Sequence, residues 1–269
     1  MPINPLNYDC LSKYPFSLAE RYSIARYLAS ISRARNPQYW DQINSKSSKY
    51  LKSLQILRRK GFINIQLPKP LSDNLISQLS CCTEDQFSKD IVQGQRHILK
   101  VSEFSSVLDL LNFQPLHDLA SLYFHAPAFV SGTYAWWHYP SLDPRIPNSQ
   151  LWHRDRDDFS QLKLFFYVTD VDSESGPHAF VPFTHNPEYF EHVFAPSEIN
   201  NPLATGSKHA FLTTEQLTSL FHPDVQIQRF ISPAGSCFIE DPRGFHRALS
   251  PTSKPRLIFS INWTLHPTN

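Results

Sequence analysis

Short aromatic and β-branched segments recur through the second half of the chain, and they constrain its fold more than any other feature. They span residues 129–139, 150–155, 162–171, 178–183, 235–240 and 256–265, with Pro, Gly, Asp and Asn between them. Such side chains favour strands, and several short strands separated by turns indicate an antiparallel barrel or a double-sheet jelly roll. We therefore expect a mainly β core over about residues 127–269.

The chain before about residue 126 is expected to be largely helical. Residues 17–35 place apolar side chains near helical spacing, with Ser17 as N-cap, and residues 38–61 form a second helical stretch. A short strand and a further helix follow at 62–70 and 73–82. Within the β core, residues of about 187–230 form a polar insert with a helix at 213–221, which could cover a binding site. We predict one α+β domain over residues 1–269.

Charge and composition narrow the classes of partner. The chain has 25 Lys and Arg against 24 Asp and Glu, with no basic block, which argues against a nucleic-acid partner and favours a small molecule. Its four cysteines form no CxxC pair, so we expect free thiols in a reducing compartment. No stretch is long and apolar enough for a membrane span or a signal peptide, so we expect a cytoplasmic protein without a membrane partner. The sequence does not indicate an oligomeric state.

The segment LWHRDRDDF, residues 151–159, first suggests a protein kinase, whose catalytic loop contains His-Arg-Asp. That loop needs an asparagine five residues after its aspartate to hold a metal ion, but Ser160 stands there. A kinase also needs a glycine-rich phosphate loop, and no two of the seven glycines are separated by a single residue. The kinase hypothesis is therefore rejected.

The same segment fits a metal site. On a strand, side chains alternate between faces, so His153 and Asp155 would point one way and Trp152 and Arg154 the other. Imidazole together with carboxylate is the ligand set of non-haem Fe(II) oxygenases, which require a second histidine and open coordination positions. The segment therefore predicts two of the three ligands of an iron site.

Four downstream histidines are candidates for the third ligand. His246 fits best, because it follows a predicted strand and Arg256 opens the next strand ten residues later. A guanidinium group there offers a two-pronged donor to the carboxylate of a dicarboxylic cosubstrate whose keto-acid end chelates iron. We expect His178 and His266 at the surface, while His185 fits either the core or the neighbourhood of the metal.

Residues 152–185, followed by 241–256, resemble the phytanoyl-CoA dioxygenase-like family of Fe(II)/2-oxoglutarate oxygenases. The resemblance covers about residues 129–265, and a looser similarity begins near Arg58. The family pattern contains His-x-Asp, a Gly-Pro turn, a strand ending in Pro-Gly-Ser-His, a distal histidine and an arginine some ten residues later. This chain has Pro-Phe-Thr-His at 182–185, which places Phe183 near the edge of the site.

The resemblance implies a double-stranded β-helix, a cupin-like jelly roll, preceded by helices. It implies Fe(II) bound by His153, Asp155 and His246, and 2-oxoglutarate bound through a carboxylate by Arg256, with Lys163 as a second candidate for that carboxylate. The implied reaction uses O2, releases succinate and CO2, and hydroxylates a C–H bond of a small-molecule metabolite or natural-product intermediate.

Other outcomes remain open at this point. Related halogenases have a small residue where this chain has Asp155, so the carboxylate favours hydroxylation, but desaturation, ring closure and epoxidation use the same ligands. The alternative class of function is a jelly roll that binds a metal or ligand without turnover.

Five residues are candidates for the substrate pocket. Tyr134, Trp136 and His138 share one face of the predicted strand 129–139, where they either line a pocket or fill the interior of the barrel. Phe183 is expected at the edge of the site. Arg243, close to His246 in sequence, could contact an anionic substrate, although an ion pair with a neighbouring aspartate is favoured. Neither the helices nor the insert identifies the substrate.

Overall fold

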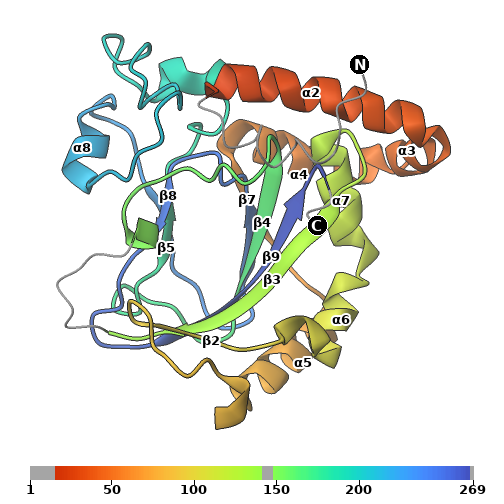
Figure 1. Ribbon diagram of the computed structural model, residues 1–269, viewed down its shortest axis with the longest axis vertical. Coiled ribbons are helices and arrows are strands. Elements are labelled where there is room, and N and C mark those ends of the chain that lie inside the picture. Colours follow the sequence, from red (N-terminus) through yellow and green to blue (C-terminus); the bar gives the residue numbers. More distant parts are fainter. Residues whose placement is uncertain (1–15, 141–147, 267–269) are drawn as a thin grey trace.

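The computed structural model describes residues 16–140 and 148–266 of the chain, and it combines helices with antiparallel sheets (Figure 1). The helices are α2 (Leu18–Arg35), α3 (Pro37–Asn44), α4 (Ser47–Lys60), α5 (Lys69–Ser80), α6 (Ser105–Leu111), α7 (Gln114–Phe124) and α8 (Thr214–Thr218). Short 3-10 turns lie at Glu84–Gln86, Val101–Glu103, Asn148–Gln150 and Pro187–His192.

Two antiparallel sheets hold the described strands. The larger sheet has the order β1-β7-β4-β9-β3-β2, and the smaller one the order β6-β5-β8. The strands are β1 (Phe62–Ile65), β2 (Gln95–His97), β3 (Phe129–His138), β4 (Gln161–Tyr167), β5 (His178–Phe180), β6 (Gln228–Phe230), β7 (Cys237–Glu240), β8 (His246–Ala248) and β9 (Arg256–Thr264). The mixture of helices and antiparallel sheets agrees with the predicted class.

The two faces of the large sheet have different partners. Leu164 and Phe166 of β4, with Phe259 and Ile261 of β9, belong to the apolar cluster that also contains the buried side chains of α4, α5 and α7. Alternate residues of the same strands point the other way, toward the smaller sheet, as Phe165 does. Figure 1 shows helices α4 to α7 along the outer side of the large sheet and β5 and β8 opposite it. The space between the sheets therefore receives one face of each central strand.

Most predicted elements are present, with differences at their ends. Helix α2 begins at the predicted cap, where Ser17 and Glu20 form a reciprocal capping box. The predicted helix over 38–61 is two helices, because the chain turns between α3 and α4, and the second ends at Gly61 in the left-handed conformation. Residues 150–155 do not form the regular strand predicted for them, and make only isolated bridges.

The insert of about 187–230 packs as a layer of its own. It contains α8 and a buried cluster in which Phe194 and Leu217 join Trp152 and Leu18. The amide of Leu18 donates to the carbonyl of Thr205 (2.9 Å), so the insert contacts the start of α2. Figure 1 shows α8 beyond the β5–β8 side of the molecule.

Two predictions about composition have structural counterparts. Cys81, Cys82 and Cys237 are free thiols, while Cys10 lies outside the described residues. Among the described helices, none has the length and apolarity required to cross a bilayer.

A buried ion pair fixes the turn between β7 and β8. Arg243 and Asp241 are both buried and pair through two guanidinium nitrogens, with Nε donating to Oδ1 at 2.9 Å. The hydroxyl of Tyr123 in α7 donates to the same carboxylate (2.6 Å), and the Arg243 guanidinium lies over the ring of Tyr22 in α2 (4.2 Å). This pair therefore ties two helices to the turn that leads to His246.

We expect Asp241→Asn to lower the free energy of unfolding by about 3–5 kcal/mol, because it leaves the Arg243 cation buried without its partner. Urea unfolding followed by circular dichroism measures the change. The matched control is Asp73→Asn, which removes the exposed i,i+4 pair with Lys69 and should cost no more than about 0.5 kcal/mol. Equal effects of the two substitutions would contradict the structural role of the buried pair.

Candidate metal centre

His153 and His246 face each other across a single β-bridge. The amide of each donates to the carbonyl of the other, at 3.1 and 3.0 Å, and the amide of Asp155 donates to the carbonyl of Pro242 (2.8 Å). These main-chain bonds align the 153–155 segment with the β7–β8 turn and β8. The side chains of this segment alternate between two faces even though it forms no regular strand. Trp152 and Arg154 are buried on the face opposite the metal ligands, among residues of the insert.

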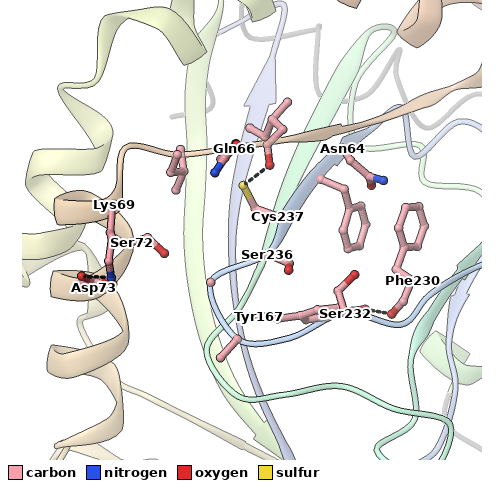
Figure 2. Close-up of a pocket in the computed structure, with 15 residues that line it drawn as sticks. Asn64, Gln66, Lys69, Ser72, Asp73, Tyr167, Phe230, Ser232, Ser236 and Cys237 are labelled. Carbon is pink, nitrogen blue, oxygen red and sulfur yellow. Dashed lines mark hydrogen bonds and ion pairs between the residues drawn. The ribbon is translucent and has the colours of Figure 1, made fainter.

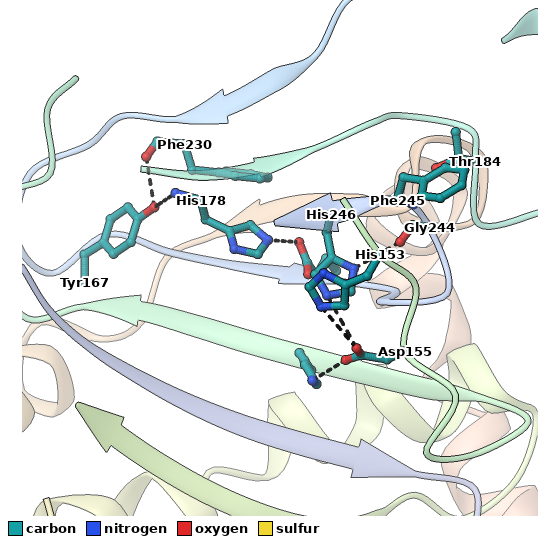
Figure 3. Close-up of polar contacts among 11 residues, drawn as sticks. His153, Asp155, Tyr167, His178, Thr184, Phe230, Gly244, Phe245 and His246 are labelled. Carbon is teal, nitrogen blue, oxygen red and sulfur yellow. Dashed lines mark hydrogen bonds and ion pairs between the residues drawn. The ribbon is translucent and has the colours of Figure 1, made fainter. Parts of the chain in front are cut away.

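The three predicted metal ligands converge (Figure 3). One ligand atom from each of His153, Asp155 and His246 lies within 4.8 Å of the others, and both Nε2 atoms are 3.6 Å from Oδ1 of Asp155. Two imidazoles and one carboxylate oxygen with this spacing form a three-residue metal site with the donor set of a non-haem iron centre.

Hydrogen bonds orient both imidazoles. Nδ1 of His153 donates to the carbonyl of Leu151 (2.8 Å), and Nδ1 of His246 donates to the carbonyl of Gly244 (3.0 Å). Because a carbonyl can only accept, Nδ1 carries the proton and Nε2 keeps its lone pair directed at the shared carboxylate.

The charges around the site favour metal binding. Burial opposes ionisation of Asp155, but the Lys163 ammonium paired with it, together with both histidines, holds its pKa below the ordinary value. Burial and the neighbouring His153 lower the pKa of His246 to about 4. The site therefore presents an ionised carboxylate and a neutral imidazole, the protonation states that a metal requires.

A cavity of about 340 Å3, here called the metal cavity, opens beside the three ligands. His153 and His246 line it together with Lys163, Arg256 and the predicted pocket residues Tyr134 and Trp136. Tyr134 is half exposed, and Trp136 stacks on His97 of β2. The face of β9 that carries Arg256 also contributes Ile258, Ser260 and Asn262, as the strand alternation predicts.

Arg256 is buried in this cavity, and no carboxylate of residues 16–140 or 148–266 pairs with it. Its side chain is 1% exposed, and its Nε and Nη1 have no hydrogen-bond partner in the same part of the chain. Nη2 lies 3.5 Å from Nδ1 of His138, whose pKa falls to about 3 because of burial and the nearby Arg256. Buried unpaired donors are costly, so a buried guanidinium with two of them indicates a missing anionic ligand.

Three predicted pocket residues do not line the metal cavity. Arg243 does not line the metal cavity, because it forms the buried pair with Asp241. Phe183 also lies outside that lining: it adopts a positive φ of 69° and packs its ring against Tyr189 and His192. His138 is buried and contacts Arg256, and it does not line the cavity either.

The structure also places residues in the site that the sequence did not indicate. His178, expected at the surface, is buried and lines the metal cavity, and its Nε2 lies 2.8 Å from Oε2 of the buried Glu240. Burial raises the pKa of Glu240 to about 7. From the insert, the ring of Phe211 lies 5.7 Å from that of His153. Phe238 and Glu240 alternate onto the inward face of their strand, so the sequence pattern could have indicated Glu240. No sequence pattern indicated Phe211.

A second cavity, of about 510 Å3, is lined by Tyr167, Phe230 and Cys237 among others (Figure 2). Its polar lining is mostly neutral, with Asn64, Gln66 and Ser236 among its members, and Lys69 is paired with Asp73. The thiol of Cys237 contacts the carbonyl of Ile65, and burial raises its pKa to about 12. This cavity presents no group prepared for metal or acid–base chemistry.

Comparisons by sequence alone give no relative: no family model matches the chain, and no curated protein matches it. Solved structures do match. The non-haem α-ketoglutarate-dependent epimerase SnoN, from nogalamycin biosynthesis, is 15% identical with a TM-score of 0.54, covering 85% of this chain and 84% of its own. HygX from Streptomyces hygroscopicus, solved with nickel and 2-oxoglutarate, is 15% identical with a TM-score of 0.51, covering 81% and 87%.

A third match has similar extent. The non-haem α-ketoglutarate-dependent carbocyclase SnoK is 15% identical with a TM-score of 0.50, covering 79% of this chain and 83% of its own. At these identities the likeness establishes the fold. The chain therefore has the fold of the non-haem 2-oxoglutarate-dependent enzymes.

Proposed function

We propose that the protein is an Fe(II)/2-oxoglutarate-dependent oxygenase formed by one domain with a jelly-roll core. The observation that carries this proposal is a three-residue metal site beside a cavity that also holds a buried guanidinium group, Arg256, with no anionic partner among the described residues. The fold shared with SnoN, SnoK and HygX supports it, because those proteins use 2-oxoglutarate or were solved with it.

The donor set fits iron. His153, Asp155 and His246 would hold Fe(II) on one side and leave the cavity side open for further ligands. When bound, the metal would supply the O2 chemistry coupled to decarboxylation of 2-oxoglutarate to succinate and CO2. The protein itself fixes the ligand geometry, through the carbonyl bonds to both imidazoles.

The cavity also fits a dicarboxylic cosubstrate. Arg256 would take the carboxylate distant from the metal, because its free Nε and Nη1 offer a two-pronged donor. Lys163 has a different immediate partner: its ammonium pairs with Oδ2 of Asp155, while Oδ1 of that carboxylate lies nearer both histidines. We infer that Lys163 orients the Asp155 ligand, and its predicted contact with 2-oxoglutarate remains a prediction.

The proposed substrate is a small molecule that enters beside Tyr134 and Trp136, with hydroxylation of a C–H bond as the outcome. Aromatic side chains at the mouth of a cavity supply a large contact area for such a ligand. Neighbours solved with nogalamycin RO and with hygromycin B, at TM-scores of 0.52 and 0.50, support a natural-product substrate class. The phytanoyl-CoA dioxygenase-like family remains the proposed affiliation, on the motif spacing.

We expect the metal-free protein, supplied anaerobically with Fe(II) and then 2-oxoglutarate, to develop a visible metal-to-ligand charge-transfer band. Asp155→Ala should abolish the band through loss of iron, and Arg256→Ala should weaken 2-oxoglutarate affinity by about tenfold or more by removing a charge-assisted donor. Arg229→Ala, at an exposed position of β6, is the control and should leave the band unchanged. Bound iron without any band would favour a metal-binding protein without this cosubstrate.

Lys163→Met separates the two roles of Lys163. If the lysine orients Asp155, Fe(II) affinity should fall by about tenfold, as for other partners of metal ligands, while the dissociation constant of 2-oxoglutarate stays within about threefold. Calorimetric titration of Fe(II), followed by 2-oxoglutarate, measures both constants. A selective loss of 2-oxoglutarate affinity would instead make Lys163 a direct cosubstrate ligand.

A further inference from the structure

A third cavity, of about 760 Å3, lies between helix α2 and the ends of α4 and α7, and shares no lining residue with the metal cavity. The side of α2 that lines it carries Ala19, Tyr22, Arg26, Ala29 and Arg33, which recur at helical spacing. The small side chains of Ala19 and Ala29 leave this space open. Arg26 and Arg33 lie at its border. We call this space the arginine cavity.

Arginine side chains from two helices supply its charge. Arg26, Arg33 and Arg58 line the cavity, and none of them forms an ion pair with any residue of 16–140 or 148–266. Arg33 and Arg58 meet at one residue, since Nη1 of Arg33 donates to the carbonyl of His125 (2.6 Å) and Nη2 of Arg58 lies 2.9 Å from its Nε2.

Helix capping explains only part of this arrangement. Arg33 and Arg58 both bond to carbonyls at the end of α7, of His125 and Leu122 respectively, which is a common role for basic side chains. These bonds hold the guanidinium planes in place, but Nε and Nη1 of Arg58 keep no hydrogen-bond partner among the described residues. Arg26 has no polar side-chain contact there at all. Capping therefore leaves two donors of Arg58 and the guanidinium group of Arg26 without a hydrogen-bond partner among the described residues.

The charge in the arginine cavity is unbalanced. Glu188 is its one acidic lining residue, and the fourth lining arginine, Arg243, is already paired with Asp241. His125 adds no charge, because burial and the neighbouring Arg58 and Arg33 lower its pKa to about 4. Three unpaired guanidinium groups against one carboxylate leave two net positive charges.

We propose that the arginine cavity is a second ligand site, separate from the metal centre, that binds a small molecule carrying a phosphoryl group. A phosphate monoester carries about two negative charges at neutral pH and three strong acceptor oxygens, which matches the two net charges and the several free donors. The aromatic side chains of Trp40 and Tyr22 border the same space and add apolar contact area, with Arg33 over the ring of Trp40 and Arg243 over that of Tyr22. The site does not depend on the proposed oxygenase activity.

Calorimetric titration of the metal-free protein with inorganic pyrophosphate at low ionic strength tests the proposal, with citrate as the carboxylate probe. We expect one pyrophosphate site per chain that binds more tightly than citrate. Arg26→Gln and Arg58→Gln should each weaken it by about tenfold, the loss of one charge-assisted hydrogen bond. Arg26→Gln removes no capping bond, so it tests binding without loss of a helix cap.

The controls separate this site from general attraction and from the metal cavity. Arg35→Gln and Arg59→Gln remove exposed arginines of the same two helices that do not line the cavity, and should leave affinity unchanged. Asp155→Ala should also bind pyrophosphate normally, so failure of the iron site and failure of this site give different results. Equal weakening by all four arginine variants, tighter binding of citrate, or no saturable binding below about 10 mM pyrophosphate would overturn the proposal.

Discussion

The buried ion pair of Asp241 and Arg243 holds together the parts that build the metal centre. It lies in the turn from β7 to β8 and contacts α2 through Tyr22 and α7 through Tyr123. Nη1 of Arg243 also donates to the carbonyl of Phe159, beyond the His-x-Asp segment (2.9 Å). Since removal of one buried partner leaves the other charge uncompensated, helices, turn and ligand segment are coupled. The helical half of the chain is thus part of the support for the site.

Arg256 shows the opposite arrangement, because no carboxylate among the described residues pairs with its buried charge. Desolvation lowers the pKa of this guanidinium, and the neighbouring His138 and His178 are both kept neutral by burial and by Arg256 itself. A structure that buries a cation without compensation is less stable than one that pairs it. An anion bound to Arg256 would offset that cost. The unpaired charge, which destabilises the ligand-free protein, therefore supports the proposed function.

The sequence predicted the ligands more accurately than the elements that carry them. His-x-Asp and a distal histidine pointed to His153, Asp155 and His246, which converge in the structure, and two of them line one cavity with the arginine that follows, Arg256. The regular strand expected at 150–155 is absent, yet main-chain bonds to β8 and to Pro242 give the same alternation. His178 was misplaced because its three-residue strand is too short to show which face is buried. Only the packing of β5 between β6 and β8 places it inside.

By itself, the sequence determined what local chemistry can fix: strand and helix periodicity, the caps at Ser17 and Gly61, and the donor types of a metal site. The tertiary structure decided which of the charged groups are paired. Arg243 was a candidate for the substrate pocket and is neutralised by Asp241, whereas Arg256, Arg26 and Arg58 have no carboxylate partner among the described residues. Pairing depends on distances between segments far apart in the chain, and no local pattern encodes those distances, because they arise only when the sheets and helices pack.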